Sequence, residues 1–246
     1  MNSARARLLF GSGLLLSTAG CGVYALPRGA TTQALVMHQD WTVFTLAGSF
    51  VAIVVFALIL FPLVVWRRRG DEYPPQFRRN NKLEITYTII PLLMVIGLFA
   101  VTYHNDIIVE HLTAHPQNTI DVTAFRWSWL FHYPGTAINI AGTPQAAPQM
   151  VLPIGETTRI NLTSVDVNHA FWIPAFLFKR DAIAGVDNSF DLFPTRMGLY
   201  RGRCAEFCGL DHALMTFTVR VVSQEDYARW LRAGGPAKVS AKGASS

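Results

Sequence analysis

The sequence has few cysteines and few charged residues. Only three cysteines occur in 246 residues, and their odd number excludes a fold held together by a complete set of paired disulfides. Charged residues make up 15% of the chain and hydrophobic residues 51%, which is too apolar for an ordinary soluble enzyme. The shortage of charge therefore indicates a chain attached to a membrane.

Two long stretches lack Asp, Glu, Lys and Arg altogether, at residues 41–66 and 85–104. Each is long enough to cross the hydrocarbon core of a bilayer as a helix. The segment between them, residues 67–84, is rich in Arg and Lys, and such loops stay in the cytoplasm. We therefore expect two transmembrane helices, a cytoplasmic loop and both chain ends outside. Buried helices of a soluble protein are the alternative, which the two lengths disfavour.

The charge balance agrees with this division. Residues 1–104 hold nine of the 21 basic and four of the 16 acidic residues, which leaves 12 of each for residues 105–246. The basic pI of about 9.3 therefore reflects membrane topology, and we expect no nucleic-acid partner.

The N-terminus has the order of a secretory signal. Arg5 and Arg7 precede an apolar stretch at residues 8–16, and small residues lead to Cys21. We expect residues 1–20 to be a signal peptide and residues 21–40 an extracytoplasmic segment. Cys21 is either the acylated first residue of a lipoprotein-like mature chain or an unmodified residue of the leader, and the sequence leaves both open.

The remainder of the chain, residues 105–233, is expected to form one exported domain. Short runs rich in β-formers lie at residues 120–126, 157–163, 189–193, 198–204 and 215–222. Their spacing predicts a small antiparallel sandwich or barrel. Residues 224–232 predict a short amphipathic helix, and residues 234–246, rich in Lys, Ser, Ala and Gly, predict a disordered tail.

Within this domain, four candidate metal ligands fall in twelve positions. They are Cys204, Cys208, His212 and Met215, and His169 lies upstream as a fifth candidate. Thiolate and thioether sulfur select soft copper, and imidazole suits copper as well. A local disulfide is a fair reading of two exported cysteines, but it gives His212 and Met215 no role. Zinc sites seldom include Met. The pattern therefore favours copper, on a loop held between two strands.

These features resemble subunit II of a haem-copper cytochrome c oxidase, whose two-copper centre is called CuA. The hairpin, the aromatic stretch at residues 124–133, the segment Asp166-Val-Asn-His169, residues 179–185 and the final C-x3-C-x3-H-x2-M occur in the family's order. The resemblance implies a membrane α hairpin followed by an all-β, cupredoxin-like sandwich or barrel. It also implies a bacterial cell membrane location, with two membrane passes and the C-terminal domain outside.

The resemblance implies a role for each candidate ligand. Cys204 and Cys208 would bridge two copper ions, His169 and His212 would each bind one of them, and Met215 would be a weak axial ligand. The carbonyl of Glu206 would be the weak ligand of the other ion. Its carboxylate would bind a Mg²⁺ shared with subunit I, since hard Mg²⁺ prefers oxygen; a solvated surface carboxylate is the alternative.

Two further residues take roles from the resemblance. Trp127 matches the tryptophan at which electrons arrive from the donor, although aromatic clusters are more commonly core. Glu84 matches a residue at the mouth of a proton-uptake route, although an acid there also favours a helix N-terminus. Arg126 and Ser128 depart from the family's common pattern.

The implied function is electron transfer from cytochrome c, or a similar small donor, to haem in subunit I, where oxygen is reduced to water with proton pumping. The implied partners are subunit I, with haem and CuB, and subunit III. Asp166 is retained near the docking site, but Val165 precedes it and the exported domain is neutral. The alternative donor is therefore a less basic cytochrome or another small copper protein. No C-x-x-C-H haem motif occurs. The alternatives are a quinol-oxidase subunit II, which lacks the copper ligands, and a membrane-anchored copper-binding or delivery protein.

Overall fold

The computed structural model describes residues 26, 29–66, 70, 73 and 78–236. The predicted signal peptide, Cys21, most of the basic loop and residues 237–246 lie outside the described residues. What was expected of those segments therefore stays a prediction.

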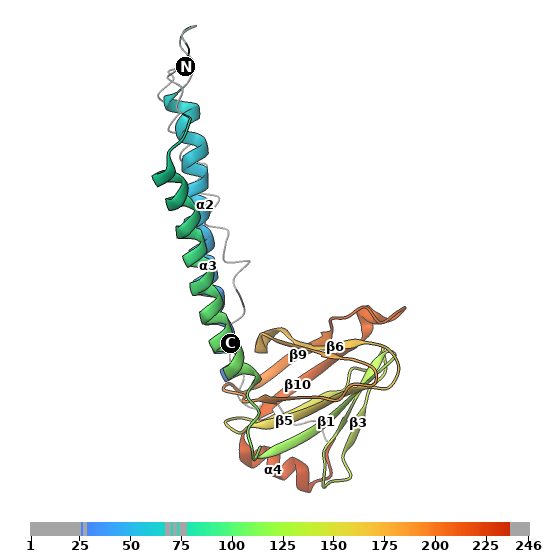
Figure 1. The fold of residues 1–246 in the computed structure, drawn as a ribbon. Coiled ribbons are helices and arrows are strands. Elements are labelled where there is room, and N and C mark those ends of the chain that lie inside the picture. The colour runs from blue at the N-terminus through green and yellow to red at the C-terminus, as the bar shows by residue number, and fades with distance from the viewer. Residues whose placement is uncertain (1–25, 27–28, 67–69, 71–72, 74–77, 237–246) are drawn as a thin grey trace, which may run out of the picture.

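Two long helices run side by side and rise from one end of a β-sandwich (Figure 1). Helix α2 spans Thr32–Val65 and α3 spans Asn81–Glu110. Each begins at a capping side chain: Thr31 accepts from the Ala34 N–H, and Asn80 accepts from the Leu83 N–H. Both helices are long and apolar enough to cross a membrane. They are longer than the uncharged runs, because their polar ends continue in helical conformation.

The β domain consists of two five-stranded sheets. The first has the order β3-β2-β1-β5-β8, with β1 at Asn118–Phe125, β2 at Ser128–His132, β3 at Asn139–Ala141, β5 at Thr158–Ser164 and β8 at Asn188–Leu192. The second has the order β4-β10-β9-β6-β7, with β4 at Gln149–Pro153, β10 at Thr216–Val222, β9 at Gly198–Cys204, β6 at His169–Ile173 and β7 at Phe178–Ala182. Two short 3-10 turns lie between strands: η2 at Pro174–Phe176 connects β6 to β7, and η3 at His212–Leu214 lies between β9 and β10. The predicted C-terminal helix is α4 at Gln224–Arg232.

The predicted fold class, a helical hairpin followed by a cupredoxin-like β-sandwich, is confirmed. The expectation of a purely antiparallel domain is wrong, because β1 pairs with β5 and β10 pairs with β4 in parallel. Parallel neighbours need a long connection between them. Such pairing brings together strands distant in sequence, and periodicity within a strand does not reveal it.

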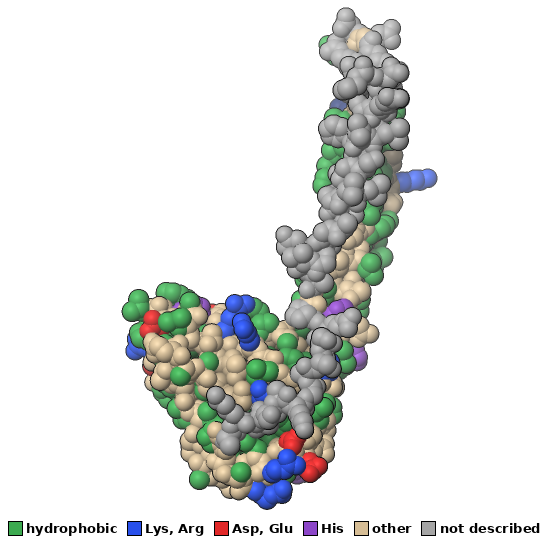
Figure 2. Space-filling model, turned by 180° about the vertical axis from the view of Figure 1, so that it is seen from behind, with side chains coloured by type: hydrophobic (Ala, Val, Ile, Leu, Met, Phe, Trp, Pro, Cys, Tyr) green, Lys and Arg blue, Asp and Glu red, His purple; other side chains and the backbone are tan. Residues whose placement is uncertain are grey.

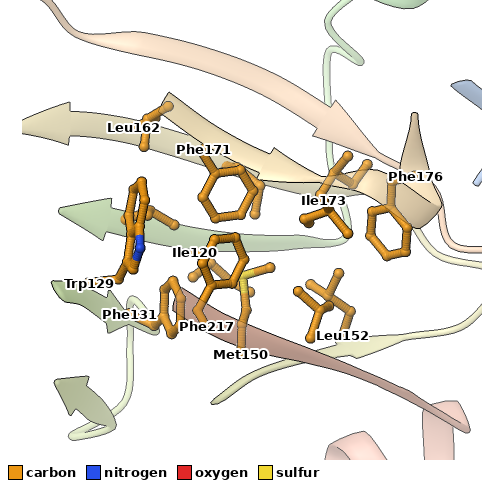
Figure 3. Close-up of a cluster of buried hydrophobic side chains, with 14 of the residues drawn as sticks. Ile120, Trp129, Phe131, Met150, Leu152, Leu162, Phe171, Ile173, Phe176 and Phe217 are labelled. Atoms are coloured by element: carbon orange, nitrogen blue, oxygen red, sulfur yellow. The ribbon is translucent and has the colours of Figure 1, made fainter. Parts of the chain in front are cut away.

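The core between the sheets is aromatic (Figure 3). The rings of Phe171 and Phe217 stack with centroids 4.6 Å apart, and Trp129 meets both rings edge-on. Beyond the area they bury, such pairs contribute about 0.5–1.5 kcal/mol each. Gly202 makes room for them, since a Cβ at this position would lie 2.2 Å from the ring of Phe217. The loop that carries the candidate ligands, residues 204–215, is therefore held by strands whose inner faces are tightly packed.

The hairpin is fastened to the sandwich by polar contacts at its lower end. Arg159 of β5 pairs with the buried Asp191 of β8, and Arg159 also donates to the carbonyl oxygen of Thr113, just after α3. The Thr113 N–H donates to Asp191 at 2.6 Å. Arg180 of β7 pairs with Glu110, the last residue of α3. These contacts set the position of the sandwich relative to the two helices.

Candidate metal centre

The candidate ligand loop leaves the sheet and returns to it between two neighbouring strands. Cys204 is the last residue of β9, Met215 immediately precedes β10, and the Cys204 N–H donates to the Met215 carbonyl at 2.9 Å. This bond closes the neck of the loop, so both sulfur-bearing residues are fixed at its base. The loop itself carries Cys208 and His212.

The side chains of the loop converge through their metal-binding atoms. The Sγ atoms of Cys204 and Cys208 are 3.9 Å apart, and Cys208 Sγ lies 3.7 Å from the Met215 sulfur. His212 Nδ1 lies 3.5 Å from Cys208 Sγ. A disulfide bond is about 2.05 Å long, and both cysteines are free thiols in a buried setting. The donor atoms thus face one common space.

His169 joins this cluster from the neighbouring strand. It is the first residue of β6 and is fully buried, and β6 pairs with β9 so that Phe171 lies opposite Cys204. Its Nδ1 lies 3.8 Å from Cys204 Sγ. Ligand atoms of His169, Cys204 and Cys208 all lie within 4.8 Å of one another. The structure therefore brings together all five predicted copper ligands.

Asp166 orients His169 from behind. Its Oδ1 lies 2.9 Å from His169 Nε2, which leaves Nδ1 turned toward Cys204. Burial opposes the charge on Asp166, but hydrogen bonds from His169, Val167 and the Arg126 N–H lower its pKa to about 2. A carboxylate behind a ligating imidazole fixes its orientation and raises its basicity. The same carboxylate accepts from the Arg126 side chain at 3.4 Å.

The two thiols differ in acidity. Burial opposes ionisation of Cys204, but hydrogen bonding with His169 and the backbone lowers its pKa to about 7. Burial and the neighbouring charge of Cys204 raise the pKa of Cys208 to about 12. One thiolate therefore forms readily near neutral pH, whereas the second needs a compensating positive charge beside it. A bound metal cation supplies such a charge.

Trp127 and Glu206 lie next to this cluster. The Trp127 indole N–H donates to the Cys208 carbonyl at 3.0 Å. Gly209 adopts a φ of +116°, and a Cβ there would lie 3.2 Å from that indole nitrogen. The Glu206 carbonyl lies 3.2 Å from Cys204 Sγ and its side chain is exposed. Trp127 and Glu206 therefore both lie beside the sulfur cluster, and the Glu206 carbonyl is in contact with Cys204 Sγ.

Glu84 is not part of the centre. It lies in the first turn of α3 and is exposed, at the end of the hairpin away from the sandwich (Figure 1). At 1.5 Å per residue, the 26 positions from Glu84 to the end of α3 correspond to a distance of about 40 Å. Any role of this residue is thus separate from the sulfur cluster. The five histidines expected to be non-ligands, His38, His104, His111, His115 and His132, lie at exposed or partly exposed positions.

Two features of the site were missed from the sequence. Asp166 was interpreted as a docking acid, but its carboxylate is occupied by His169 and Arg126 and its side chain is 20% exposed. The spacing Asp-x-x-His was the available signal, because it brings a carboxylate back to an imidazole across one turn. In addition, Phe207 and Leu210 on the ligand loop are 80% and 88% exposed, an apolar surface beside the cluster that no periodicity indicated.

The donor set fits copper. Two buried thiols, two imidazoles and a thioether offer soft and borderline donors, and the metal-binding cluster found among the described residues includes no carboxylate. Zinc would leave the Met215 sulfur without a role. The separation of the two sulfurs leaves both available to a metal, as the copper reading requires.

Comparison with known proteins agrees with this site. Residues 142–222 match the family described as cytochrome C oxidase subunit II, periplasmic domain. A probable cytochrome c oxidase subunit 2 of Streptomyces avermitilis is 34% identical, with 90% of this chain and 84% of the relative covered. Cytochrome c oxidase subunit 2 of Corynebacterium glutamicum is 32% identical, over 83% of this chain and 74% of the relative. The crystal structure of the periplasmic domain of subunit II of cytochrome oxidase from Bradyrhizobium japonicum is 31% identical, covering 50% of this chain and 96% of that one, with a TM-score of 0.46.

Proposed function

Because the chain belongs to the cytochrome c oxidase subunit II family and so to an oxidoreductase complex, we propose that it receives electrons for that complex at a CuA centre. Electrons would come from cytochrome c or a similar small donor and pass to haem in subunit I. Oxygen reduction and proton pumping then take place in the other subunits. The observation that carries this proposal is the convergence of five soft and borderline donors, four of them buried, in one cluster.

We assign the metal-holding residues by their atoms. Cys204 and Cys208 would each offer a thiolate to both copper ions, His169 and His212 would bind through Nδ1, and Met215 and the Glu206 carbonyl would be weak ligands. When bound, the copper pair supplies reversible one-electron redox chemistry. The protein holds the donor atoms in place. The paired strands β6 and β9, and the backbone hydrogen bond from Cys204 to Met215 at the neck of the loop, limit their movement.

Trp127 is the proposed site at which electrons reach the chain. Its indole hydrogen bond to the Cys208 carbonyl is a short, rigid link from a partly exposed ring to a ligand residue. The exposed Phe207 and Leu210 lie on either side of Cys208 in the ligand loop and offer an apolar contact to a docking donor. Because His169 and Arg126 engage the Asp166 carboxylate, this acid is not free to steer a basic donor, and we expect a donor that is not strongly basic.

Two other assignments concern exposed carboxylates, those of Glu206 and Glu84. We propose that the exposed Glu206 carboxylate binds Mg²⁺ together with subunit I, because an oxygen donor next to a sulfur cluster separates hard from soft metals. We also propose that Glu84 accepts protons from the cytoplasmic side for subunit I. This proton-uptake role predicts that Glu84→Ala slows turnover of the oxidase while the rate of copper reduction is unchanged.

The proposed location is the bacterial cell membrane, crossed twice, with the sandwich outside. The apolar hairpin and the family's periplasmic domain make the chain a membrane-anchored protein with an extracytoplasmic domain. The two passes follow from helix length and from the basic loop between them. Subunits I and III are the proposed neighbours of the hairpin. The intact copper ligands argue against a quinol oxidase.

Rapid mixing of the assembled oxidase with reduced donor tests the proposal. Trp127→Phe keeps an aromatic ring but removes the donor to the Cys208 carbonyl, and it should slow copper reduction, because the hydrogen-bonded link between the ring and this ligand residue is lost. Trp66→Phe, at the far end of α2, is the matched control and should leave that rate unchanged. Copper content should be equal in both. Equal rates of copper reduction in both variants would contradict the assignment of Trp127.

A further inference from the structure

A cleft of about 620 Å³ separates helix α2 from the second sheet. Its walls come from two distant parts of the chain: Leu26, Met37, Asp40, Trp41 and Phe44 on one side, and Trp172, Pro174, Leu177 and Lys179 on the other. Trp41 and Phe44 are 50% and 43% exposed. The volume is of the size that holds an organic ligand.

The cleft lies where the polar end of the hairpin meets its apolar part. Asp40 accepts a hydrogen bond from Asn105 of α3, and these two residues mark the same height on both helices. The uncharged run of α2 begins at the next residue, Trp41. Trp41 and Phe44 therefore line the membrane side of the cleft, whereas Lys179 lies on the water side. Tryptophan is enriched at this boundary in membrane proteins.

On the sheet side, a cationic row faces outward from the sandwich. In cross-strand register, Trp172 of β6 lies opposite Arg203 of β9 on one side and opposite Lys179 of β7 on the other. Their chain neighbours, such as Phe171 and Phe178, point into the core. The Arg203 guanidinium lies over the Trp172 ring at 4.4 Å. Since adjacent strands are about 4.8 Å apart, the two cations flank one indole at short range.

The row has an excess of positive charge. Among the residues that the structure describes, neither Arg201 nor Arg203 has a carboxylate partner within ion-pair distance, and Lys179 pairs with Asp181 at an exposed position. A second cavity of about 450 Å³ adjoins the cleft at Pro174 and is lined by both arginines. Among the described residues, Asp40 is the only acid lining the cleft, and Asn105 engages its carboxylate. In Figure 2, basic side chains lie at the upper rim of the sandwich and also at its base, away from the hairpin.

We propose that this cleft binds an anionic phospholipid from the leaflet on the sandwich side of the membrane. The lipid phosphate contacts Arg203 and Lys179 beside the Trp172 ring, and an acyl chain lies against Trp41 and Phe44. An apolar wall on the membrane side and a row of cations on the water side match a phospholipid in both polarity and direction. No bond is made or broken, and the lipid fills the space between the hairpin and the sandwich.

Native mass spectrometry of the full chain in detergent tests the proposal, with phosphatidylglycerol and phosphatidylcholine of equal chain length as probes. Each basic side chain near a lipid surface contributes about a factor of five, so phosphatidylglycerol should bind on the order of thirty-fold more tightly than phosphatidylcholine. The double variant Lys179→Gln with Arg203→Gln should lose this preference. Arg229→Gln with Arg232→Gln on α4 removes the same charge elsewhere and should keep it.

Equal binding of the two lipids by the unmodified chain would overturn the proposal, as would an equal loss of preference in the α4 control. A second experiment identifies the occupant in native membranes, where a photoreactive p-benzoylphenylalanine replaces Phe44. A lipid adduct supports the proposal. A cross-link to another polypeptide instead would show that a protein fills the cleft and would overturn it.

Discussion

The sandwich and the hairpin of this chain obtain their order from different sources. The sandwich buries its own aromatic core and holds its candidate ligands with internal hydrogen bonds. In the hairpin, by contrast, only Ala34 of α2 and Val109 of α3 are buried, both near the sandwich. The comparison teaches that the candidate metal site is specified by contacts within the chain, whereas the exposed apolar helices need an apolar surrounding such as a membrane.

The largest expected effect is on the metal site of the sandwich. Cys208→Ser removes one of the two thiolates proposed to bridge the copper ions, and serine oxygen is too hard a donor to replace it for copper. The copper content of the full chain should fall from two ions to one or none, as measured by elemental analysis. Cys21→Ser makes the same change in the predicted leader and should leave the copper content unchanged. Two coppers in the Cys208→Ser chain would rule out thiolate bridging.

Paired phenylalanine substitutions compare the two regions directly. Phe171 is fully buried between Phe217 and Trp129, so Phe171→Ala should lower the free energy of unfolding of the sandwich by about 3–5 kcal/mol. Phe99 in α3 is 69% exposed, and Phe99→Ala should change that free energy by less than about 0.5 kcal/mol. Denaturant titration monitored by sandwich fluorescence measures both. Similar losses would mean that the hairpin contributes to the folding of the sandwich.

The junction between the regions rests on a buried ion pair. Asp191 is 4% exposed and holds both Arg159 and the Thr113 N–H. Asp191→Asn leaves the Arg159 charge without its partner, which should destabilise the sandwich by about 3 kcal/mol. The exposed Asp187→Asn is the control and should have little effect. The result is read from thermal unfolding of the full chain, and an unchanged transition in Asp191→Asn would contradict this account.

The smallest expected effect is a pH dependence that belongs to the sandwich alone. Asp166 has a pKa of about 2 in the folded chain against an ordinary value of 3.8. A lowered pKa means that the folded state favours the ionised carboxylate. The contribution of Asp166 to the free energy of unfolding is therefore complete above about pH 4 and is lost as the pH falls toward 2. The difference corresponds to about 2 kcal/mol. In copper-free chains, Asp166→Asn should remove this part of the acid sensitivity. A variant as acid-sensitive as the unmodified chain would show that Asp166 is not stabilised in this way.

The sequence predicted most of what depends on local pattern. The convergence of the five candidate ligands, the hairpin and five of the ten strands follow from donor chemistry, uncharged runs and alternation. The parallel pairing of β4 with β10 did not, because it depends on how distant segments meet. The contact of Asp166 with His169 is local, and the Asp-x-x-His spacing was a signal for it that was not used. The cleft lies between a helix and a strand that are more than 100 residues apart in the sequence, at Trp41 and Lys179, so no local signal could indicate it.

The central claim is that two thiolates of this chain jointly hold two copper ions. Electron paramagnetic resonance of the copper-loaded full chain, combined with its copper content, tests this most directly. We expect two copper ions per chain and one unpaired electron shared equally by both nuclei. A spectrum from a single isolated copper, or a disulfide between Cys204 and Cys208 in the loaded chain, would contradict the account.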